Sequence, residues 1–428
     1  MTDLREGIVA AEPESVDEFR ARARAWIRAN LPASTPSDQV GYLRPRFTDE
    51  EELAEVEEAR QLQRQFYDAG LAGVCFPREY GGLGLTPAHQ MALREELSGF
   101  AYPFRLQAPT FSPCATVLLE FGTHEQKLRH LPAIIKGEEL WMQLLSEPSG
   151  GSDVAAALMT AVRDGEEWIL NGSKVWTTGA WFSDWGLCLA RTNWDVPKHR
   201  GLSVFIFPLH QPGIEIHRIE MLNGFKDFCQ EFITDVRVPD SARIGDVNEG
   251  WTIGTRWMFH ERMLHNSPYV TSATGNAGSS RRSLHNVDIA RDSGCIDDPV
   301  SRDLLGEAYM LELVGEVIQH RIAEGISTGK MSDQAASVGR LYSGVSTTRL
   351  TSIAFELAGS SATAWDDTDG AAAEIGNDYL LRQVSTLGGG TTEMARNVIS
   401  ERVLGMPREL SYDRNTAFRD VPKGPPAK

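Results

Sequence analysis

Apolar residues recur every three or four positions over much of the first third of the chain, which is the spacing of one face of an α-helix. Between Val16 and Ile27 this spacing follows Ser15, a typical helix N-cap, and precedes Leu31-Pro32, where a helix would end. A Gly/Pro-rich loop interrupts the pattern farther on. The spacing predicts three further helices, at residues 49–69, 86–100 and 124–139.

The middle of the chain has a different pattern, in which apolar residues gather in short runs rich in Val, Ile, Phe and Leu. The runs 168–170 and 174–178 flank Asn171-Gly172, a dipeptide favoured in two-residue turns, so a β-hairpin is predicted there. Four more runs follow, separated by Gly, Pro, Asn or Asp. Short strands at this spacing indicate a β-barrel or sandwich.

Helical spacing returns near Gly250. It predicts long amphipathic helices at residues 251–265, 298–325, 333–359 and 390–405. The order of helices, then strands, then helices favours three domains packed together over a parallel α/β sheet.

Composition narrows the possible partners. The 428 residues are enough for two to four domains, and 42 Lys and Arg against 59 Asp and Glu give a formal charge of −17. This excess of negative charge argues against nucleic acid or an anionic membrane surface as a partner. No apolar run approaches the ~20 residues needed to span a bilayer.

The cysteines and the two ends of the chain indicate the compartment. Five cysteines are scattered without a CxxC pair, which fits free thiols in a reducing compartment better than disulfides or a zinc site. The acidic N-terminal residues lack the apolar core of a secretory signal. We therefore expect a cytoplasmic protein without a metal, and we expect the polar residues 411–428 to form a flexible tail.

Two Gly- or Trp-containing segments are candidates for ligand contacts. Residues 145–156, LSEPSGGSDVAA, form a loop that can bring backbone N–H groups close to a flat ring or a phosphate, although from spacing alone an ordinary domain-boundary loop is the commoner case. Trp176 beside two threonines can pack against a cofactor, but a core Trp in a hairpin is the commoner case.

Two further segments are candidates for anion binding and for proton transfer. Three glycines precede Thr391 and Thr392 at the predicted start of a helix. The backbone N–H groups there can bind an anion. Equally, Thr391 or Thr392 can serve only as the helix N-cap. Glu261-Arg262 lies in an apolar helical stretch. Burial there would raise the pKa of Glu261, which suits a general base. A lone Glu-Arg dipeptide, however, more often forms an ion pair on the surface. No HExxH, P-loop or GxSxG motif is present.

Taken in order, these motifs resemble the acyl-CoA dehydrogenase flavoprotein family. The segments that carry the resemblance are residues 76–86, 121–153, 170–192, 224–251 and 388–409. The resemblance implies an α+β fold with an N-terminal α-helical domain (1–140), a middle β-barrel (141–248) and a C-terminal four-helix bundle (249–410), followed by the tail (411–428).

The resemblance also implies chemistry. It implies bound FAD, α,β-dehydrogenation of an acyl-CoA thioester, electron-transfer flavoprotein as the electron acceptor, and a homo- or hetero-oligomer arranged as a dimer of dimers. The positions matching flavin contacts are Gln143, Leu145, Ser146, Gly151, Ser152, Trp176, Thr178, Thr391 and Glu393. Ser152 and Arg262 match residues near the substrate.

One departure from the family identifies the base. Many members carry it as a Glu before the Gly-Thr of the last motif, where this chain has Gly389. In isovaleryl- and long-chain-type members a Glu-Arg dipeptide after the β domain supplies it instead, and Glu261-Arg262 falls there. The resemblance thus implies Glu261 as base and the Gly389 backbone N–H as a donor to the thioester carbonyl.

Two other departures affect the cofactor site. Residues 281–299 lack the usual Arg-x-x-Phe-Gly motif, and residues 356–365 lack the usual Gln-x-x-Gly-Gly-x-Gly loop. This pattern resembles actinobacterial members that work as heteromeric pairs, some on sterol side-chain thioesters. It leaves open an alternative in which the chain is a non-catalytic or half-site structural subunit.

Overall fold

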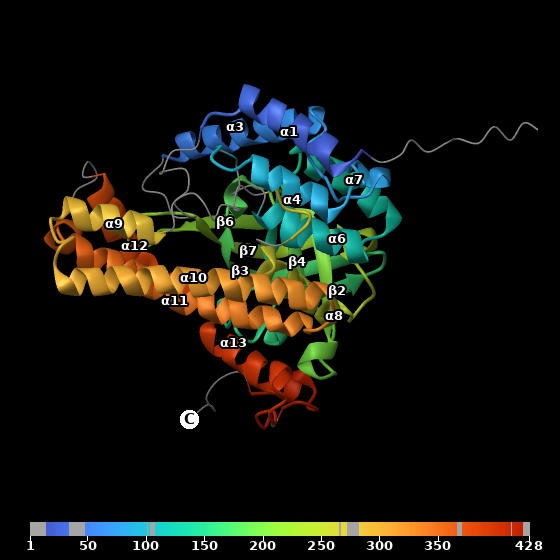
Figure 1. The fold of residues 1–428 in the computed structure, drawn as a ribbon. Coiled ribbons are helices and arrows are strands. Elements are labelled where there is room, and N and C mark those ends of the chain that lie inside the picture. The colour runs from blue at the N-terminus through green and yellow to red at the C-terminus, as the bar shows by residue number, and fades with distance from the viewer. Residues whose placement is uncertain are drawn as a thin grey trace, which may run out of the picture.

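The computed structural model describes residues 14–33, 48–100, 102, 108–264, 267–271, 282–365, 370–411 and 413–422. It has the predicted order of a helical region, a sheet and a second helical region (Figure 1). Within these residues, no helix combines the length and the apolar character that crossing a membrane would require.

The N-terminal region consists of short helices that pack over one side of the sheet (Figure 1). Helix α1 starts with a capping box between Ser15 and Glu18 and buries Phe19, Ala23 and Ile27, which lie four residues apart. The region comprises α1 (Val16–Asn30), α3 (Asp49–Asp68), α4 (Pro87–Glu96), a π-helical segment (Thr110–Ala115), α6 (Thr116–Phe121) and α7 (His124–Lys136). The predicted helices are thus present here.

The middle region is one sheet of eight strands. Strands pair in the order β6-β7-β3-β2-β4-β5-β8, and β1 pairs with β4 in parallel. Apolar side chains of β2, β3 and β7 meet those of β4 and β5 in a buried core. The strands are β1 (Trp141–Leu144), β2 (Thr160–Asp164), β3 (Glu167–Thr178), β4 (Trp185–Arg191), β5 (Leu202–Pro208), β6 (Ile214–Ile219), β7 (Phe228–Pro239) and β8 (Arg243–Ile244).

The hairpin predicted at Asn171-Gly172 is wrong. Both residues lie within the continuous strand β3, at a register shift against β7. A side chain at Gly172 would come within 2.8 Å of Met159 on the neighbouring chain segment, so the glycine permits close packing. The chain reverses instead between β2 and β3 at Gly165, which has a φ of +65°.

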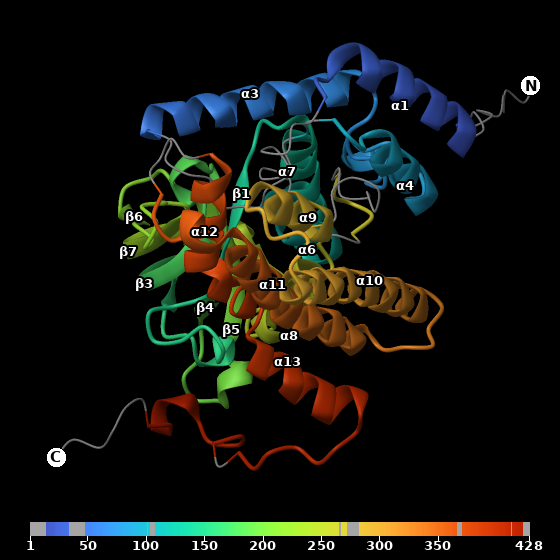
Figure 2. The same cartoon turned by 60° about the vertical axis from the view of Figure 1, so that its left-hand side comes forward.

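The C-terminal region is helical. Helices α10 and α11 form a long pair, and α9 and α12 pack at one end of it (Figure 2). The region comprises α8 (Gly250–Arg262), α9 (Arg282–Asp292), α10 (Pro299–Ser327), α11 (Ala336–Ala358), α12 (Ala371–Leu381) and α13 (Thr392–Val398), which continues as a π-helical segment (Ile399–Val403).

Helix α8 joins the three regions. Its Ile253 and Trp257 belong to the same buried core as the N-terminal helices and strands β4 and β5. Ser112, in the π-helical segment, donates a hydrogen bond to the backbone oxygen of His260 at 3.0 Å. These contacts fix the last turn of α8, which carries Glu261, against the rest of the molecule.

The tail differs from the expected flexible segment. Phe418 is only 2% exposed and stacks on Trp194, with the ring centroids 5.4 Å apart. The backbone N–H groups of Phe418 and Arg419 donate to the oxygens of Val196 and Trp194. Residues 413–422 are therefore anchored to the β4–β5 connection, because the aromatic ring of Phe418 is buried there. Tyr412 and residues 423–428, also part of the expected tail, lie outside the described residues.

Candidate active site

A hydrogen-bonded chain of three side chains leads from the core to Glu261. Trp257, one turn before Glu261 on α8, donates from Nε1 to Oε1 of Gln143 on β1 at 2.6 Å. The Nε2 of Gln143 then donates to Oε1 of Glu261 at 3.1 Å. Because Trp257 is fully buried, it fixes which end of the Gln143 amide faces the carboxylate.

The surroundings of Glu261 make it a stronger base than an exposed carboxylate. Burial raises the pKa of Glu261 above its usual value of 4.5, as the sequence predicted, while the hydrogen bond from Gln143 and the charges of Arg262 and Arg340 oppose that rise. The Cys114 thiol lies nearby in the π-helical segment. Burial raises the pKa of this thiol, and the charge of Glu261 raises it further. Proton acceptance by Glu261 is therefore favoured.

Two arginines flank the glycine loop before α13. A side chain built at Gly390 would lie 3.6 Å from Nη2 of Arg262, and one at Gly389 would lie 3.6 Å from Nε of Arg340. Arg340 also donates from Nη2 to the Gly388 oxygen at 2.6 Å. Gly389 has a φ of +70°, and its N–H has no hydrogen-bond acceptor among the described residues. The structure thus brings Glu261, Arg262 and this loop together.

A buried ion pair anchors the 145–156 loop to strand β3. Lys174 on β3 donates from Nζ to Oε1 of Glu147 at 2.9 Å and to the Leu145 oxygen at 3.1 Å. The Ser146 oxygen accepts from the Val175 N–H at 3.0 Å, which places this loop beside β3. Farther along the loop, Gly151 and Ser152 are exposed. Leu145, Ser146, Gly151 and Ser152 therefore form one surface.

Trp176, which follows Val175 on β3, has an unusual conformation. It has a φ of +66°, at a second register shift between β3 and β7, and its side chain is 55% exposed. A left-handed backbone conformation costs free energy in a residue with a large side chain, and such strain is concentrated at ligand sites. Thr178 follows two positions later on the strand and is partly exposed. The core position considered for Trp176 is therefore wrong.

Thr391 and Glu393 lie elsewhere. Thr391 caps α13 by accepting a hydrogen bond from the Met394 N–H at 3.1 Å, and Glu393 is exposed. No hydrogen bond in the part of the chain that the structure describes joins either residue to the surface around Trp176. Within one chain, the described hydrogen bonds thus leave these two residues unconnected to the other proposed flavin contacts.

Sequence reasoning missed Arg340 and the Lys174–Glu147 pair. Arg340 lies in α11, 48 positions before the loop that it contacts, and no local motif marks it. The sequence shows a carboxylate in the 145–156 loop and a lysine in a predicted strand. It does not show that they pair, because their contact depends on how the loop folds over β3.

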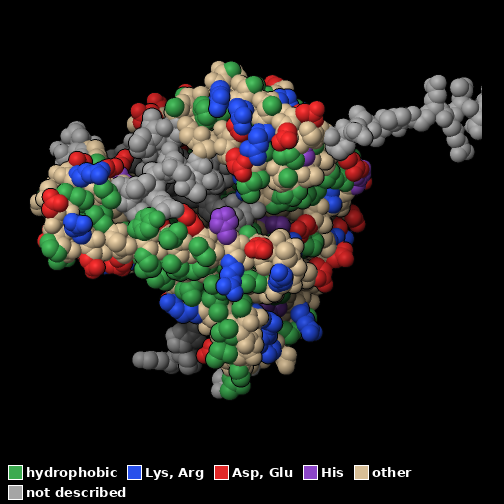
Figure 3. All heavy atoms as spheres, viewed as in Figure 1, with side chains coloured by type: hydrophobic (Ala, Val, Ile, Leu, Met, Phe, Trp, Pro, Cys, Tyr) green, Lys and Arg blue, Asp and Glu red, His purple; other side chains and the backbone are tan. Residues whose placement is uncertain are grey.

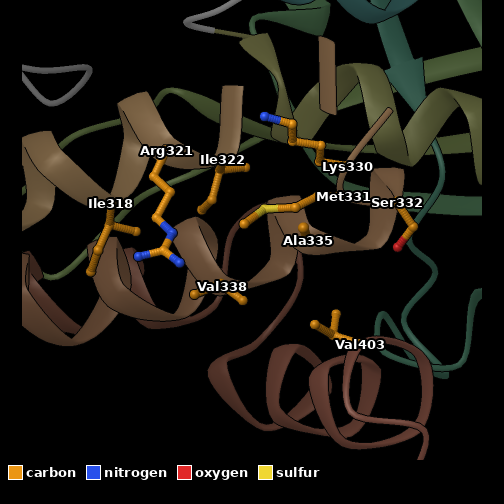
Figure 4. Close-up of a pocket in the computed structure, with 9 residues that line it drawn as sticks. All are labelled: Ile318, Arg321, Ile322, Lys330, Met331, Ser332, Ala335, Val338 and Val403. Carbon is orange, nitrogen blue, oxygen red and sulfur yellow. The ribbon is translucent and has the colours of Figure 1, made fainter. Parts of the chain in front are cut away.

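A separate hollow lies between α10, α11 and the π-helical segment at Ile399–Val403. Arg321, Lys330 and mainly apolar side chains line it (Figure 4). It contains no carboxylate and none of the residues considered above, so it has no part in the site. Within the described residues, no group of His, Cys, Asp and Glu could hold a metal ion, and all five cysteines are free.

Comparison with known proteins identifies the family. Models of the acyl-CoA dehydrogenase N-terminal, middle and C-terminal domains match residues 14–138, 143–236 and 248–404. The chain is 33% identical to acyl-CoA dehydrogenase IpdE1 of Mycobacterium tuberculosis, over 92% of this chain and 99% of that protein. It is 34% identical to acyl-CoA dehydrogenase FadE34 of the same organism, over 86% of this chain and 49% of that protein.

Solved structures agree with this result. The Tcur3481-Tcur3483 steroid ACAD is 26% identical with a TM-score of 0.72, covering 95% of this chain and 100% of that one. The ChsE4-ChsE5 complex from Mycobacterium tuberculosis is 26% identical with a TM-score of 0.70, covering 92% and 98%. The three regions, in the order expected from the sequence, match these folds. This chain therefore belongs to the acyl-CoA dehydrogenase family.

Proposed function

We propose that the chain is a catalytic, FAD-dependent acyl-CoA dehydrogenase in which Glu261 removes the α-proton of the thioester. The observation that carries this proposal is the position of Glu261. It is held by Gln143 and lies near a loop in which Gly389 leaves no competing carboxylate. FAD, when bound, would supply the acceptor for the β-hydride, and electron-transfer flavoprotein would then take up the electrons.

The exposed surface around Trp176 suits a flat, polar-edged ring. An exposed indole on a strained backbone offers an aromatic face, and Ser146, Ser152 and Thr178 offer hydroxyl groups beside it. We propose that these residues, with Gln143, Leu145 and Gly151, hold the isoalloxazine end of FAD, and that Thr391 and Glu393 contact its adenosine end, in a neighbouring subunit.

The remaining steps use groups of this chain. The Gly389 N–H, which has no acceptor among the described residues, donates to the thioester carbonyl as negative charge develops on it. Arg262 and Ser152 contact the substrate. Trp257 keeps the Gln143 amide oriented, so that Glu261 presents its carboxylate in one position before the proton is transferred.

An anaerobic reduction assay tests the proposal. The purified protein is mixed with straight-chain, branched and steroid-type acyl-CoA thioesters, and bleaching of the flavin is followed. Glu261→Gln is expected to retain flavin but reduce it about 10²–10⁴-fold more slowly. Glu249→Gln, an exposed carboxylate at the start of α8, is the matched control. Full turnover by E261Q would show that the base is another group.

A second candidate is a half-site subunit of a heteromeric enzyme. Helix α10 exposes an apolar strip made of Tyr309, Met310, Leu313, Val314 and Val317, the last 60% exposed, and Figure 3 shows apolar side chains gathered over this helix. Such a strip favours an oligomer. The similar structures named above are a Tcur3481-Tcur3483 enzyme and a ChsE4-ChsE5 complex, so the partner in this second candidate is a paralogous chain.

Flavin stoichiometry distinguishes the two candidates. The chain is expressed alone and together with a paralogous chain, and the FAD content and mass of each species are measured. One FAD per chain in an active homo-oligomer supports the catalytic proposal. A colourless protein that becomes yellow and active only with a partner supports the half-site subunit.

A further inference from the structure

Arg340 lies where the loop before α13 meets the proposed base. It projects from the first turns of α11, and its Nη2 donates to the Gly388 oxygen at 2.6 Å. Its Nε is buried and has no hydrogen-bond partner within the described residues. A buried N–H without a partner costs free energy, so other contacts of the guanidinium have to offset the hydrogen bond that Nε does not make.

The packing around Arg340 depends on a glycine of its own helix. A side chain built at Gly344, one turn farther along α11, would come within 2.8 Å of Nη1 of Arg340. One built at Gly389 would meet its Nε at 3.6 Å. The first distance is too short for a real Cβ and the second is an ordinary contact, so it is Gly344 that leaves space for the guanidinium.

Arg340 also takes part in the charge balance of the site. Glu261 faces Arg262 from its own helix, Arg340 from α11, Cys114 from the π-helical segment and Gln143 from β1. Burial lowers the pKa of both arginines, and the Glu261 charge opposes that fall. Two positive groups thus accompany one carboxylate in a desolvated site, where charges act strongly on one another.

We propose that Arg340 is a positioning residue for this reaction, which fixes the Gly388–Gly390 loop through the Gly388 carbonyl and supplies a second positive charge that keeps Glu261 ionised. This inference rests on the proposed function. The hydrogen bond holds the Gly388–Gly389 peptide, and hence the direction of the Gly389 N–H. The charge favours the form of Glu261 that can accept a proton.

The test is the pH profile of flavin reduction in Arg340→Met, Arg340→Lys and wild type. Removing the charge in R340M is expected to move the acid limb up by about one pH unit, so that the rate below that limb falls about tenfold. R340K keeps a charge, so its limb is expected to stay at the wild-type position with a lower maximum rate. Arg349→Met, on the same helix but paired with Glu307 and Glu356, is the matched control and is expected to leave the limb unmoved.

Gly344→Ala provides a second route to the same result, because it displaces the guanidinium without removing its charge. It is expected to lower the maximum rate and to move the limb upward less than R340M does. A wild-type profile in R340M overturns the proposal. If R340M does not fold, a wild-type profile and rate in G344A overturns it. Activity in E261Q would instead refute the proposed function, whereas an inactive E261Q with an unchanged R340M refutes only the role of Arg340.

Discussion

The Nε2 of Gln143 donates a hydrogen bond to Oε1 of Glu261 at 3.1 Å, although the two residues are 118 positions apart in the chain. This bond connects the first strand of the sheet with the last turn of α8. It also favours the ionised carboxylate, because only that form is a full acceptor on both oxygens.

Gln143→Leu should therefore narrow the pH range in which Glu261 is ionised. Losing the donor removes an interaction that lowers the pKa of Glu261, so the acid limb of the reduction rate is expected to move to higher pH. Trp257→Phe is the companion variant, since it leaves Gln143 in place but unanchored, and a smaller shift is expected. Flavin content is measured for both. An unmoved limb in Q143L would contradict this role.

The wild-type enzyme should itself lose activity in acid. Burial raises the pKa of Glu261 above 4.5. The carboxylate accepts protons only above its pKa, so the rate is expected to fall as the pH decreases through a value higher than that of an ordinary Glu. Anaerobic reduction rates measured between pH 4 and 9 test this expectation, and a rate that stays constant down to the ordinary Glu pKa of 4.5 would be inconsistent with Glu261 as base.

Glu231 should make the fold progressively less stable as the pH rises from 4.5 to about 8. It is fully buried on β7, where burial raises its pKa to about 8 despite the hydrogen bond from Thr177 at 2.9 Å. Between pH 4.5 and 8 the unfolded chain releases this proton and the folded chain keeps it, so stability falls as the pH rises. Glu231→Gln is expected to raise the melting temperature at pH 8 more than at pH 5.5. The exposed Glu215→Gln is the control, and an identical pH dependence in E231Q and wild type would disprove the assignment.

The Lys174–Glu147 pair should be costly to break. Lys174→Met leaves the buried Glu147 carboxylate without its cation, which is expected to lower the free energy of unfolding by about 3–5 kcal/mol. The double variant with Glu147→Gln should recover part of this loss. Urea unfolding measures both, with Lys226→Met as an exposed control. A loss below about 1 kcal/mol in K174M would show that the pair contributes little.

Phe418 should hold the tail in place. Its buried ring lies on Trp194 and 4.0 Å from the guanidinium of Arg191, which in turn donates to the Ala155 and Ala157 oxygens. Phe418→Ala removes about 1.5–3 kcal/mol of apolar burial, so proteolysis of residues 413–422 should become about ten- to a hundredfold faster. The more exposed Phe232→Ala is the control. Unchanged cleavage in F418A would mean that other contacts hold the tail.

The hydrophobic pattern by itself determined the order of the regions and most helix positions. Apolar residues at three- to four-residue spacing and a capping Ser15 specify α1 locally, because helix geometry repeats over a few residues. The Glu-Arg dipeptide at the end of α8 and the missing side chain at Gly389 also identified the candidate base without any structure. Local propensity misled at Asn171-Gly172, where packing against Met159 and pairing with β7 outweighed the turn preference.

Only the tertiary structure decided which distant groups surround that base. Gln143, Arg262 and Arg340 come from a strand and two helices, and their contacts depend on how the three regions pack around α8. The burial of Phe418 and the strained backbone of Trp176 depend in the same way on residues remote in sequence. Side-chain contacts between separate elements are set by their packing and not by local periodicity, so the candidate for the base was readable from the sequence and its electrostatic environment was not.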